Sequence, residues 1–470
     1  MSILALDLGT SSVRAMVLDE EAQPVPDALA RRPVVVTQER NGAATINGDI
    51  YLAAVADCLD ELAAGGWLDG VEGVVSAAQW HSLLPLDARG APLGPVMVWL
   101  DTRAEVPDGA DGPADPDAFH HRTGTWWHRS YWTVRVPWLR PRLGTTPARF
   151  VGLVEYVLGA LLTDAPMSVS QASGTGLLDL MTLDWDPEAC DIAGVRPREL
   201  LPLAPEGWRG RLRPEYARRW PQLRDAWWAP ALGDGAASNI GSGCVDADRA
   251  AVTVGTSSAV RLVQTIPAGQ PLPPLPESLW RYRVDHQRVV TGSAFSSGGN
   301  LFAWAKRELR LPDGPALEAA LERVRPGHGV WADPRFGGDR PPGQAPPGSG
   351  QLMGLSFDTT AVDVLAALMD GVCRQISAAL TVIESTVGRE VDVVLGGGAI
   401  AASRWWRRAF REALAPRTVW RIANPEIAAT GAGLLALGLI DDPKWNFRAI
   451  GWMDDSDSAG SPGDGRPLNP

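Results

Sequence analysis

One stretch near the N-terminus reads Ala5-Leu6-Asp7-Leu8-Gly9-Thr10-Ser11-Ser12-Val13-Arg14, and a counterpart in the second half of the chain reads Val252-Thr253-Val254-Gly255-Thr256-Ser257-Ser258-Ala259-Val260-Arg261. In each copy, apolar or β-branched residues flank a Gly-Thr-Ser-Ser turn, which predicts a strand, a tight turn and a second strand. Glycine lets the backbone come close to a ligand, and successive turn N–H groups and hydroxyls form a concavity that binds anions. Two such hairpins, one per half, predict two similar lobes that hold a polyphosphate between them.

The two copies differ at a position that matters for a metal ion. Asp7 stands two residues before the first glycine, and Thr253 has the same place in the second copy. Carboxylate oxygens are ligands that Mg²⁺ prefers, whereas threonine offers only a hydroxyl. The asymmetry therefore predicts a phosphotransferase with Mg²⁺ on the side of the first lobe. A single hairpin of this kind is an ordinary turn in most proteins, so the prediction depends on the repetition.

Composition is typical of a large enzyme that works in water. The length of 470 residues fits two large α/β lobes. The net charge of −12 disfavours nucleic acid and anionic membrane surfaces as partners. No apolar run approaches the length of a membrane span, and the N-terminus has no basic region of a signal peptide. The four cysteines lack metal-ligand or redox spacing and predict buried thiols in a reducing compartment, so we expect a cytoplasmic protein: Cys58, Cys190, Cys244 and Cys373.

Strand and helix patterns alternate along the chain, which predicts an α/β fold. In the first half we expect strands over residues 3–8, 13–18, 33–37 and 71–77, and a helix over 49–64. In the second half we expect a long buried helix over 365–383, a strand over 391–395 and a closing helix over 427–439. A break near 242–248 separates the lobes, and residues 340–350 form a loop rich in proline and glycine.

The tripeptide Gly233-Asp234-Gly235 lies just before this break, where a carboxylate would face the cleft between the lobes. Phosphoryl transfer to an alcohol needs a carboxylate that accepts the proton of the attacking hydroxyl. Flanking glycines keep such an acid free of crowding side chains. The alternative is a turn aspartate, but its position between the two hairpins makes Asp234 the candidate catalytic base.

Two glycine-rich segments offer further nucleotide contacts. Gly396-Gly397-Gly398 leads from a predicted strand into a helix, and Gly298-Gly299 precedes another helix. Such turns let the backbone approach adenine or ribose, and a helix N-terminus attracts phosphate, although similar turns occur throughout α/β proteins. The chain contains no Gly-x-x-x-x-Gly-Lys-Ser/Thr element, which argues against a Walker-type nucleotide site.

In combination, these motifs resemble the FGGY family of carbohydrate kinases, within the superfamily that also contains heat-shock chaperones and actin. The resemblance runs from Ile3 to about Leu439 and rests on five motifs: Asp7-Leu8-Gly9-Thr10-Ser11-Ser12, Trp99-Leu100-Asp101-Thr102-Arg103, Gly233-Asp234-Gly235, Val254-Gly255-Thr256-Ser257 and Leu395-Gly396-Gly397-Gly398-Ala399. It implies two ribonuclease-H-like lobes, as in the actin-like ATPases, with a nucleotide cleft between them. The lobes would span residues 1–243, for the sugar and the base, and 244–452, for the nucleotide; we expect 453–470 to be a disordered tail.

The resemblance also implies ATP and Mg²⁺ as cofactors and assigns roles to individual residues. Asp234 is the implied base and Asp7 lies near the metal ion. The implied nucleotide contacts are Thr10, Ser11, Ser12, Arg14, Gly255, Thr256, Gly298, Gly397 and Gly398. The implied sugar contacts are Trp80, His81, Arg103 and Asp234.

Several segments resemble gluconokinases more than xylulokinases or glycerol kinases, among them His81-Ser82-Leu83, Thr123-Gly124-Thr125, Glu155-Tyr156-Val157 and Ser170-Gln171-Ala172-Ser173-Gly174. Gluconate requires a cation near its carboxylate, and Arg103 or His81 would supply one. The alternative for Arg103 is a salt bridge with Asp101. Trp80 stands where methionine is usual before the histidine, and the tryptophan would reshape or narrow the sugar pocket.

These observations predict ATP-dependent phosphorylation of a hydroxyl of a small sugar or sugar acid, with D-gluconate preferred. Two alternatives stay open: another FGGY substrate such as xylulose, ribulose or a polyol, and a non-catalytic sensor of sugar or ATP with this fold. We expect a small-molecule partner, no nucleic acid and no membrane, with a homodimer left open as the assembly state.

Overall fold

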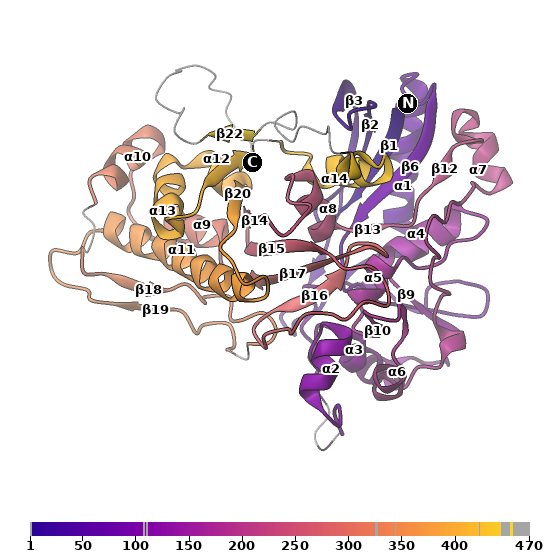
Figure 1. Ribbon diagram of the computed structural model, residues 1–470, viewed down its shortest axis with the longest axis horizontal. Helices are drawn as coiled ribbons and strands as arrows, with labels where there is room; N and C mark the ends of the chain where they lie inside the picture. The colour runs from indigo at the N-terminus through magenta and orange to yellow at the C-terminus, as the bar shows by residue number, and fades with distance from the viewer. Residues whose placement is uncertain are drawn as a thin grey trace.

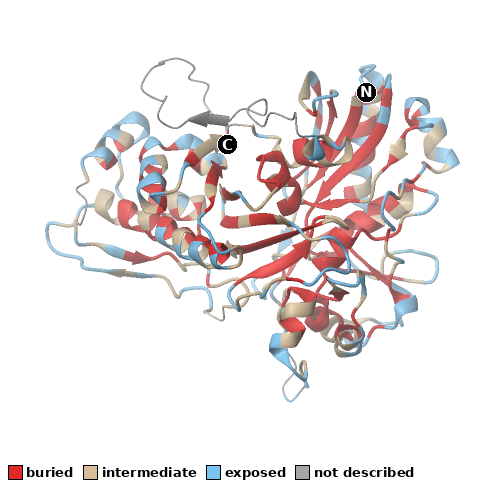
Figure 2. Cartoon of the chain, viewed as in Figure 1, coloured by how far each residue is buried: buried red, intermediate tan, exposed pale blue. Residues whose placement is uncertain are grey.

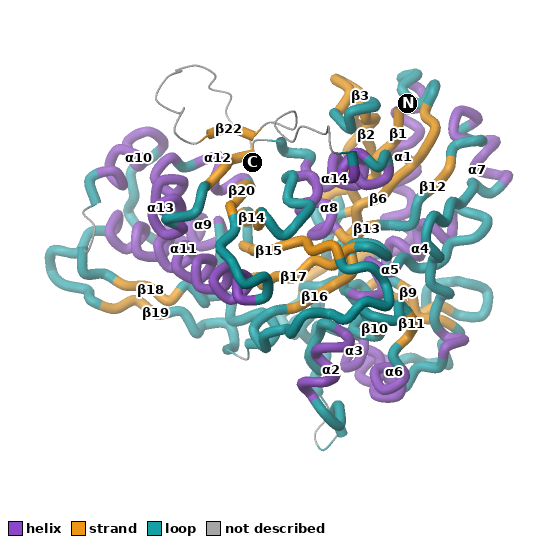
Figure 3. The backbone as a smooth tube through the Cα atoms, viewed as in Figure 1, coloured by secondary structure: helices purple, strands orange, loops and turns teal. Residues whose placement is uncertain are grey.

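The computed structural model describes residues 2–106, 109, 111–324, 328–343, 345–422, 424–442 and 452–454. Two large mixed sheets lie side by side, one from each half of the chain, with helices on their outer faces and two helices between them (Figure 1, Figure 3). The first sheet has the order β12-β6-β1-β2-β3, and β13 also pairs with β6. Its strands are β1 (Ser2–Leu8), β2 (Ser12–Leu18), β3 (Pro24–Pro33), β6 (Val71–Ala78), β12 (Trp227–Trp228) and β13 (Leu232–Gly233).

The second sheet repeats the core of the first and adds a strand at each edge, β16 and β22. Its order is β16-β17-β15-β14-β20-β21-β22. The strands are β14 (Arg249–Val254), β15 (Ser258–Thr265), β16 (Trp280–Arg283), β17 (Arg288–Phe295), β20 (Asp392–Gly396), β21 (Val419–Ile422) and β22 (Trp452–Asp454). Neighbouring strands are antiparallel in β1-β2-β3 of the first sheet and in β14-β15-β17 of the second. The first strand of each sheet also has a parallel neighbour: β6 beside β1, and β20 beside β14. The two lobes are therefore ribonuclease-H-like.

Helices connect and cover the sheets. Those of the first half are α1 (Gly48–Ala64), α2 (Pro116–Thr123), α3 (Trp132–Leu139), α4 (Leu153–Leu161), α5 (Val169–Ser173), α6 (Pro187–Ala193), α7 (Pro214–Arg219) and α8 (Asp234–Gly241). Those of the second half are α9 (Gly299–Glu308), α10 (Gly314–Glu322), α11 (Ala361–Ser385), α12 (Gly398–Ala402), α13 (Arg404–Leu414) and α14 (Ile427–Ala436). Short strands complete the fold: β4 (Thr37–Gln38), β5 (Ala44–Ile46), β7 (Leu84–Leu86), β8 (Val96–Met97), β9 (Arg149–Val151), β10 (Leu178–Asp179), β11 (Asp184–Trp185), β18 (Trp331–Asp333) and β19 (Gln351–Met353).

Alternation along β1 determines where its polar residue lies. Leu4, Leu6 and Leu8 pack in the outer core of the first lobe, beneath α1. Ile3 and Ala5 point to the opposite face, into a core shared by both lobes. Because side chains of a strand alternate between faces, Asp7 belongs to this inner face at the carboxyl end of β1. Figure 2 shows that the central strands of both sheets, and helix α8 between them, are mostly buried.

Two helices, α8 and α14, pack directly against each other between the sheets (Figure 1). A Cβ added to Gly431 would lie 1.9 Å from the Ala237 carbonyl oxygen, and one added to Gly241 would lie 1.9 Å from the Ile427 carbonyl oxygen. Glycine at both contacts therefore allows the helix backbones to touch. The short distance between the helices brings Asp234, the first residue of α8, into the space between the lobes.

Most predicted elements are present, with two corrections. The strand expected over residues 33–37 is wrong, because the third strand is β3, Pro24–Pro33. Small Ala28 and Ala30 supply its buried face, so the strand lacks the large apolar residues that mark a half-buried strand. Met453 and Asp454, which the sequence placed in the tail, lie in β22, and residues 455–470 are outside the described residues.

The long helix α11 is apolar enough to cross a membrane by length and composition. Its apolar residues, including Leu368, Val372, Ile376 and Leu380, are instead buried in the core of the second lobe. A Thr360–Asp363 capping box starts the helix. Packing against the sheet thus accounts for its apolar composition.

Candidate active site

Both predicted hairpin turns are present, one at the end of each central strand. In the first turn, the Gly9 N–H donates to the Ser12 carbonyl at 3.2 Å, and in the second the Gly255 N–H donates to the Ser257 carbonyl at 2.9 Å. Ser11 and Thr256 are exposed at the tips, whereas Ser12 is buried in β2. The exposed hydroxyls can therefore meet a phosphate.

Helix α9 supports the second turn from below. The N–H groups of Gly299 and Asn300 donate to the Gly255 and Thr256 carbonyls at 2.7 and 3.1 Å. A Cβ on Gly298 would lie 2.7 Å from the Ser257 carbonyl carbon. Gly298 thus permits close packing of α9 on the turn, and Gly299 is the residue that faces the neighbouring cavity.

That cavity, of about 650 Å³, lies in the second lobe. It brings together the turn, the start of α9 and helix α12, and its lining residues are Gly255, Thr256, Gly299, Asn300, Phe302, Ala303, Arg307, Glu318, Gly398, Ala399, Ala402, Ser403 and Trp406. A Cβ on Gly398 would meet open space, so this glycine leaves room at the cavity wall. Gly397 has φ +106° and its Cβ position is 2.3 Å from the Val254 carbonyl oxygen, so it packs on β14 instead. The size and the apolar walls fit a nucleoside.

Asp7 forms an ion pair at the end of β1. Its Oδ2 lies 2.5 Å from Nη2 of Arg14, whose Nη1 lies 2.7 Å from Oε2 of Glu426 in the second lobe. Burial raises the pKa of Asp7 to about 6, and the Arg14 charge opposes that rise. Arg14, expected to contact the nucleotide, thus links Asp7 to the other lobe.

The metal prediction can be tested on the chemistry of these groups. Within the described residues, no group of three or more His, Cys, Asp or Glu side chains could hold an ion by itself. Mg²⁺ in kinase sites usually takes one or two carboxylates and completes its shell with water and phosphate oxygens. Asp7, a buried carboxylate next to the first hairpin turn, fits that kind of site.

Asp234 is the first residue of α8 and follows β13 directly. Its Oδ1 accepts a hydrogen bond from the Gly235 N–H at 2.7 Å. Burial raises the pKa of Asp234, while the positive charges of Arg261 and Arg340 oppose the rise. Asp7 and Asp234 are close enough that the charge of Asp234 also raises the pKa of Asp7. The structure thus brings the two predicted carboxylates together.

Trp80 is buried behind Asp234, and only 6% of its surface is exposed. Its Nε1–H donates to the Ser170 carbonyl at 3.0 Å. The nearest atoms to a Cβ added at Gly233 or Gly235 belong to the Trp80 ring, at 1.9 and 2.6 Å. The structure therefore places Trp80 as a support beneath the Gly-Asp-Gly segment.

His81 is half-buried and adopts a left-handed backbone conformation with φ +66°. Its Nδ1 lies 2.7 Å from the Gly174 carbonyl, which can only accept, so Nδ1 carries the proton. Burial lowers the pKa of His81 to about 3, so the ring is neutral at pH 7. Nε2 is then an acceptor suited to a hydroxyl, and His81 does not supply a cation for a carboxylate.

Arg103 also differs from the expectation of a substrate cation. Its Nη2 lies 2.6 Å from Oδ2 of buried Asp101, and its Nε bonds both oxygens of the same carboxylate. The salt-bridge alternative is the one that the structure contains. Arg103 therefore fixes the loop after β8, and its charge is neutralised there.

Arg135 was not among the predicted site residues, although it holds together three segments around His81. This fully buried arginine donates to the backbone carbonyls of Arg129, His81 and Asp101 at 3.0, 2.5 and 3.0 Å. Satisfying these three acceptors fixes the strained backbone of His81. Nothing in the local sequence marks it, because the carbonyls come from segments far apart in the chain.

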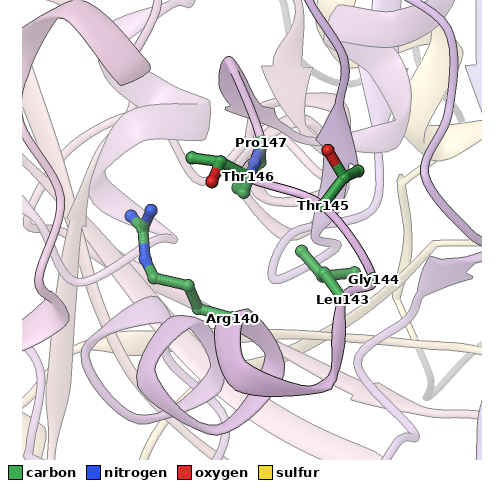
Figure 4. Close-up of a pocket in the computed structure, with 6 residues that line it drawn as sticks. All are labelled: Arg140, Leu143, Gly144, Thr145, Thr146 and Pro147. Carbon is green, nitrogen blue, oxygen red and sulfur yellow. The ribbon is translucent and has the colours of Figure 1, made fainter.

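A second hollow, of about 300 Å³, follows helix α3, and none of the predicted site residues lines it. Figure 4 shows Arg140 along one side and Thr146 and Pro147 along the other. Arg140 is engaged there with Glu199 at 3.0 Å and with the Gly194 carbonyl at 2.9 Å. Its guanidinium therefore stabilises the local structure.

Comparisons with known proteins agree on one family. Residues 2–241 match the N-terminal domain of the FGGY family of carbohydrate kinases, and residues 250–438 match the C-terminal domain. A gluconokinase from Bacillus subtilis is 25% identical, covering 93% of this chain and 88% of the relative. A xylulose kinase from Klebsiella pneumoniae is also 25% identical, covering 93% and 90%. The fold matches the crystal structure of a gluconate kinase from Lactobacillus acidophilus, with a TM-score of 0.83, 22% identity and coverage of 96% and 91%.

Proposed function

Because the chain belongs to the FGGY family of carbohydrate kinases, we propose that it transfers the terminal phosphate of ATP to a primary hydroxyl of D-gluconate, giving 6-phosphogluconate. The protein is an ATP-dependent carbohydrate kinase of two ribonuclease-H-like lobes. The family leaves the substrate open, because gluconokinases, xylulose kinases and glycerol kinases are similarly distant relatives.

The position of Asp234 is the observation that carries the chemical proposal. It begins a helix between the lobes, near Asp7. A carboxylate there accepts the proton of the attacking hydroxyl, and burial makes it a stronger base than an exposed aspartate. Positioned turn hydroxyls and amides bind the phosphate oxygens.

The remaining side chains orient the substrate. The acceptor Nε2 of His81 binds a sugar hydroxyl, and Trp80 holds Asp234 in place from behind. A magnesium ion held at Asp7 would neutralise charge on the phosphate oxygens. Closure of the lobes excludes water, since an open site would waste ATP by hydrolysis.

Gluconate is proposed over neutral sugars because gluconokinases are among the curated relatives and several motifs follow theirs. Xylulose, ribulose or another polyol is the alternative substrate, and a non-catalytic sensor the alternative class. We also propose a cytoplasmic location, in agreement with the four free, buried cysteines.

The test is ADP release from MgATP with gluconate, xylulose, ribulose and glycerol in parallel. Gluconate should give the highest kcat/KM. A higher kcat/KM with another sugar would assign that sugar as the substrate in place of gluconate. Tight ATP binding with no turnover of any of these compounds would favour a non-catalytic sensor.

A further inference from the structure

Two arginines of the second lobe reach the first lobe beside Asp234. Arg261 lies on β15, on the same face as Ala259 and Val263, which turns toward α8. Its Nε is 3.0 Å from the position of a Cβ on Gly235, and this atom is buried without a hydrogen-bond partner. Arg340 belongs to the loop after β18, and its Cζ lies 4.3 Å from the ring centroid of Trp99 in the first lobe.

These two guanidinium groups leave an unbalanced positive charge. Both act on the Asp234 carboxyl, and their own pKa values are lowered, mainly by burial. Among the described residues, neither forms an ion pair with a carboxylate within 4.0 Å. One negative charge, that of Asp234, thus faces two positive charges.

The other cations near the sugar site are already engaged. Arg103 is paired with Asp101, Arg135 donates to three backbone carbonyls, and His81 is neutral. Neither Arg261 nor Arg340 lines the cavity beside the second turn, so they are not contacts of the nucleoside. Arg340 is on the sugar side, since it covers Trp99 and its charge acts on His81.

We propose that Arg261 and Arg340 together bind the carboxylate of the substrate. These two arginines of the second lobe would then select a sugar acid over a neutral sugar when the lobes meet. The planar guanidinium group suits this task because it binds a carboxylate through two parallel hydrogen bonds. The Trp99 ring packs against the Arg340 guanidinium and holds it in position. The inference rests on the proposed function and replaces Arg103 and His81 as the source of the cation.

The test is steady-state kinetics of Arg340→Gln with gluconate and with glucitol, a neutral polyol of the same length. Arg340 is chosen because Arg261 lies against the Gly-Asp-Gly segment, where substitution would also move the base. We expect KM for gluconate to rise about 10- to 100-fold, the range for a lost hydrogen bond to a charged group. KM for ATP and kcat/KM for glucitol should stay within about twofold, and Arg340→Lys should recover part of the loss.

Arg335→Gln is the matched control, because Arg335 is in the same loop but is paired with Asp333 at 2.6 Å. It should leave KM for gluconate unchanged, and thermal unfolding should show that all variants fold. If the wild type turns over gluconate and Arg340→Gln has the same KM for gluconate, the inference is overturned and the proposed function stays intact. A rise in KM for ATP instead would assign Arg340 to phosphate. Wild-type turnover of neutral sugars alone would overturn both proposals.

Discussion

Replacing Gly233 by alanine should destabilise the protein through a single neighbour, Trp80. The backbone at Gly233 has φ −63° and ψ 137°, which alanine adopts without strain. The three atoms nearest to an added Cβ all belong to the Trp80 indole, at 1.9, 2.2 and 2.2 Å. Trp80 cannot withdraw, because it is packed against Trp280 and Tyr282 and donates to the Ser170 carbonyl.

Overpacking of this kind costs about 1–3 kcal/mol, or more where the neighbour is fixed. For lobes of this size, 1 kcal/mol corresponds to about 2–4 °C in the midpoint of thermal unfolding. We therefore expect Gly233→Ala to lower the midpoint by about 2–12 °C in the wild-type background. In a Trp80→Ala background, which itself costs about 3–5 kcal/mol, the same change should cost less than half as much.

The assay is a double-mutant cycle followed by thermal unfolding with intrinsic fluorescence and calorimetry. Gly94→Ala is the control, because a Cβ at Gly94 meets no atom within 4 Å and its φ is not positive. It should change the midpoint by no more than about 1–2 °C. Equal losses from Gly233→Ala in both backgrounds would refute the view that Trp80 supports the Gly-Asp-Gly segment.

Two further predictions concern the first lobe. Burial raises the pKa of Glu155 from 4.5 to about 7. Between these pH values the folded state therefore binds more protons than the unfolded state. The free energy of unfolding should fall by at most about 3 kcal/mol as pH rises through that window. Urea unfolding from pH 4.5 to 8 should show a larger fall in the wild type than in Glu155→Gln, where the raised pKa values of Asp7 and Asp234 still contribute. Equal falls in the two proteins would contradict the prediction. Arg135→Met removes the donor to three backbone carbonyls, of which that of Asp101 is buried, so we expect a loss of about 2–5 kcal/mol in the free energy of unfolding. Because His81 is then less fixed, KM for the sugar should rise with little change in KM for ATP. Loss of stability with an unchanged sugar KM would show that Arg135 does not position His81.

The sequence predicted the fold well because the motif that matters is local and repeated. Two Gly-Thr-Ser-Ser turns with apolar flanks are enough to predict two hairpins, and the structure contains both in equivalent places of two matching sheets. The third strand of the first sheet was missed because Ala28 and Ala30 form its buried face, and such small residues give little signal above the background.

The carboxylates of the site were predictable for the same reason, since Asp7 and Asp234 are each marked by neighbouring glycines. The cations were not. Arg261 and Arg340 become neighbours of Asp234 only when the two lobes meet, and Arg103 looked available only because sequence alone left its pairing with Asp101 open. Which charged side chains become neighbours depends on the folded chain, and the spacing of apolar residues along the sequence does not indicate it.

The most direct test of the account is the turnover of Asp234→Asn with MgATP and gluconate, measured beside the wild type. Asparagine keeps the size of the side chain and an oxygen that accepts the Gly235 N–H, so folding should be preserved. If Asp234 is the base, kcat should fall by at least about 10²-fold, while ATP binding and the unfolding midpoint stay close to those of the wild type. Near-normal turnover in a folded Asp234→Asn protein would contradict the central claim.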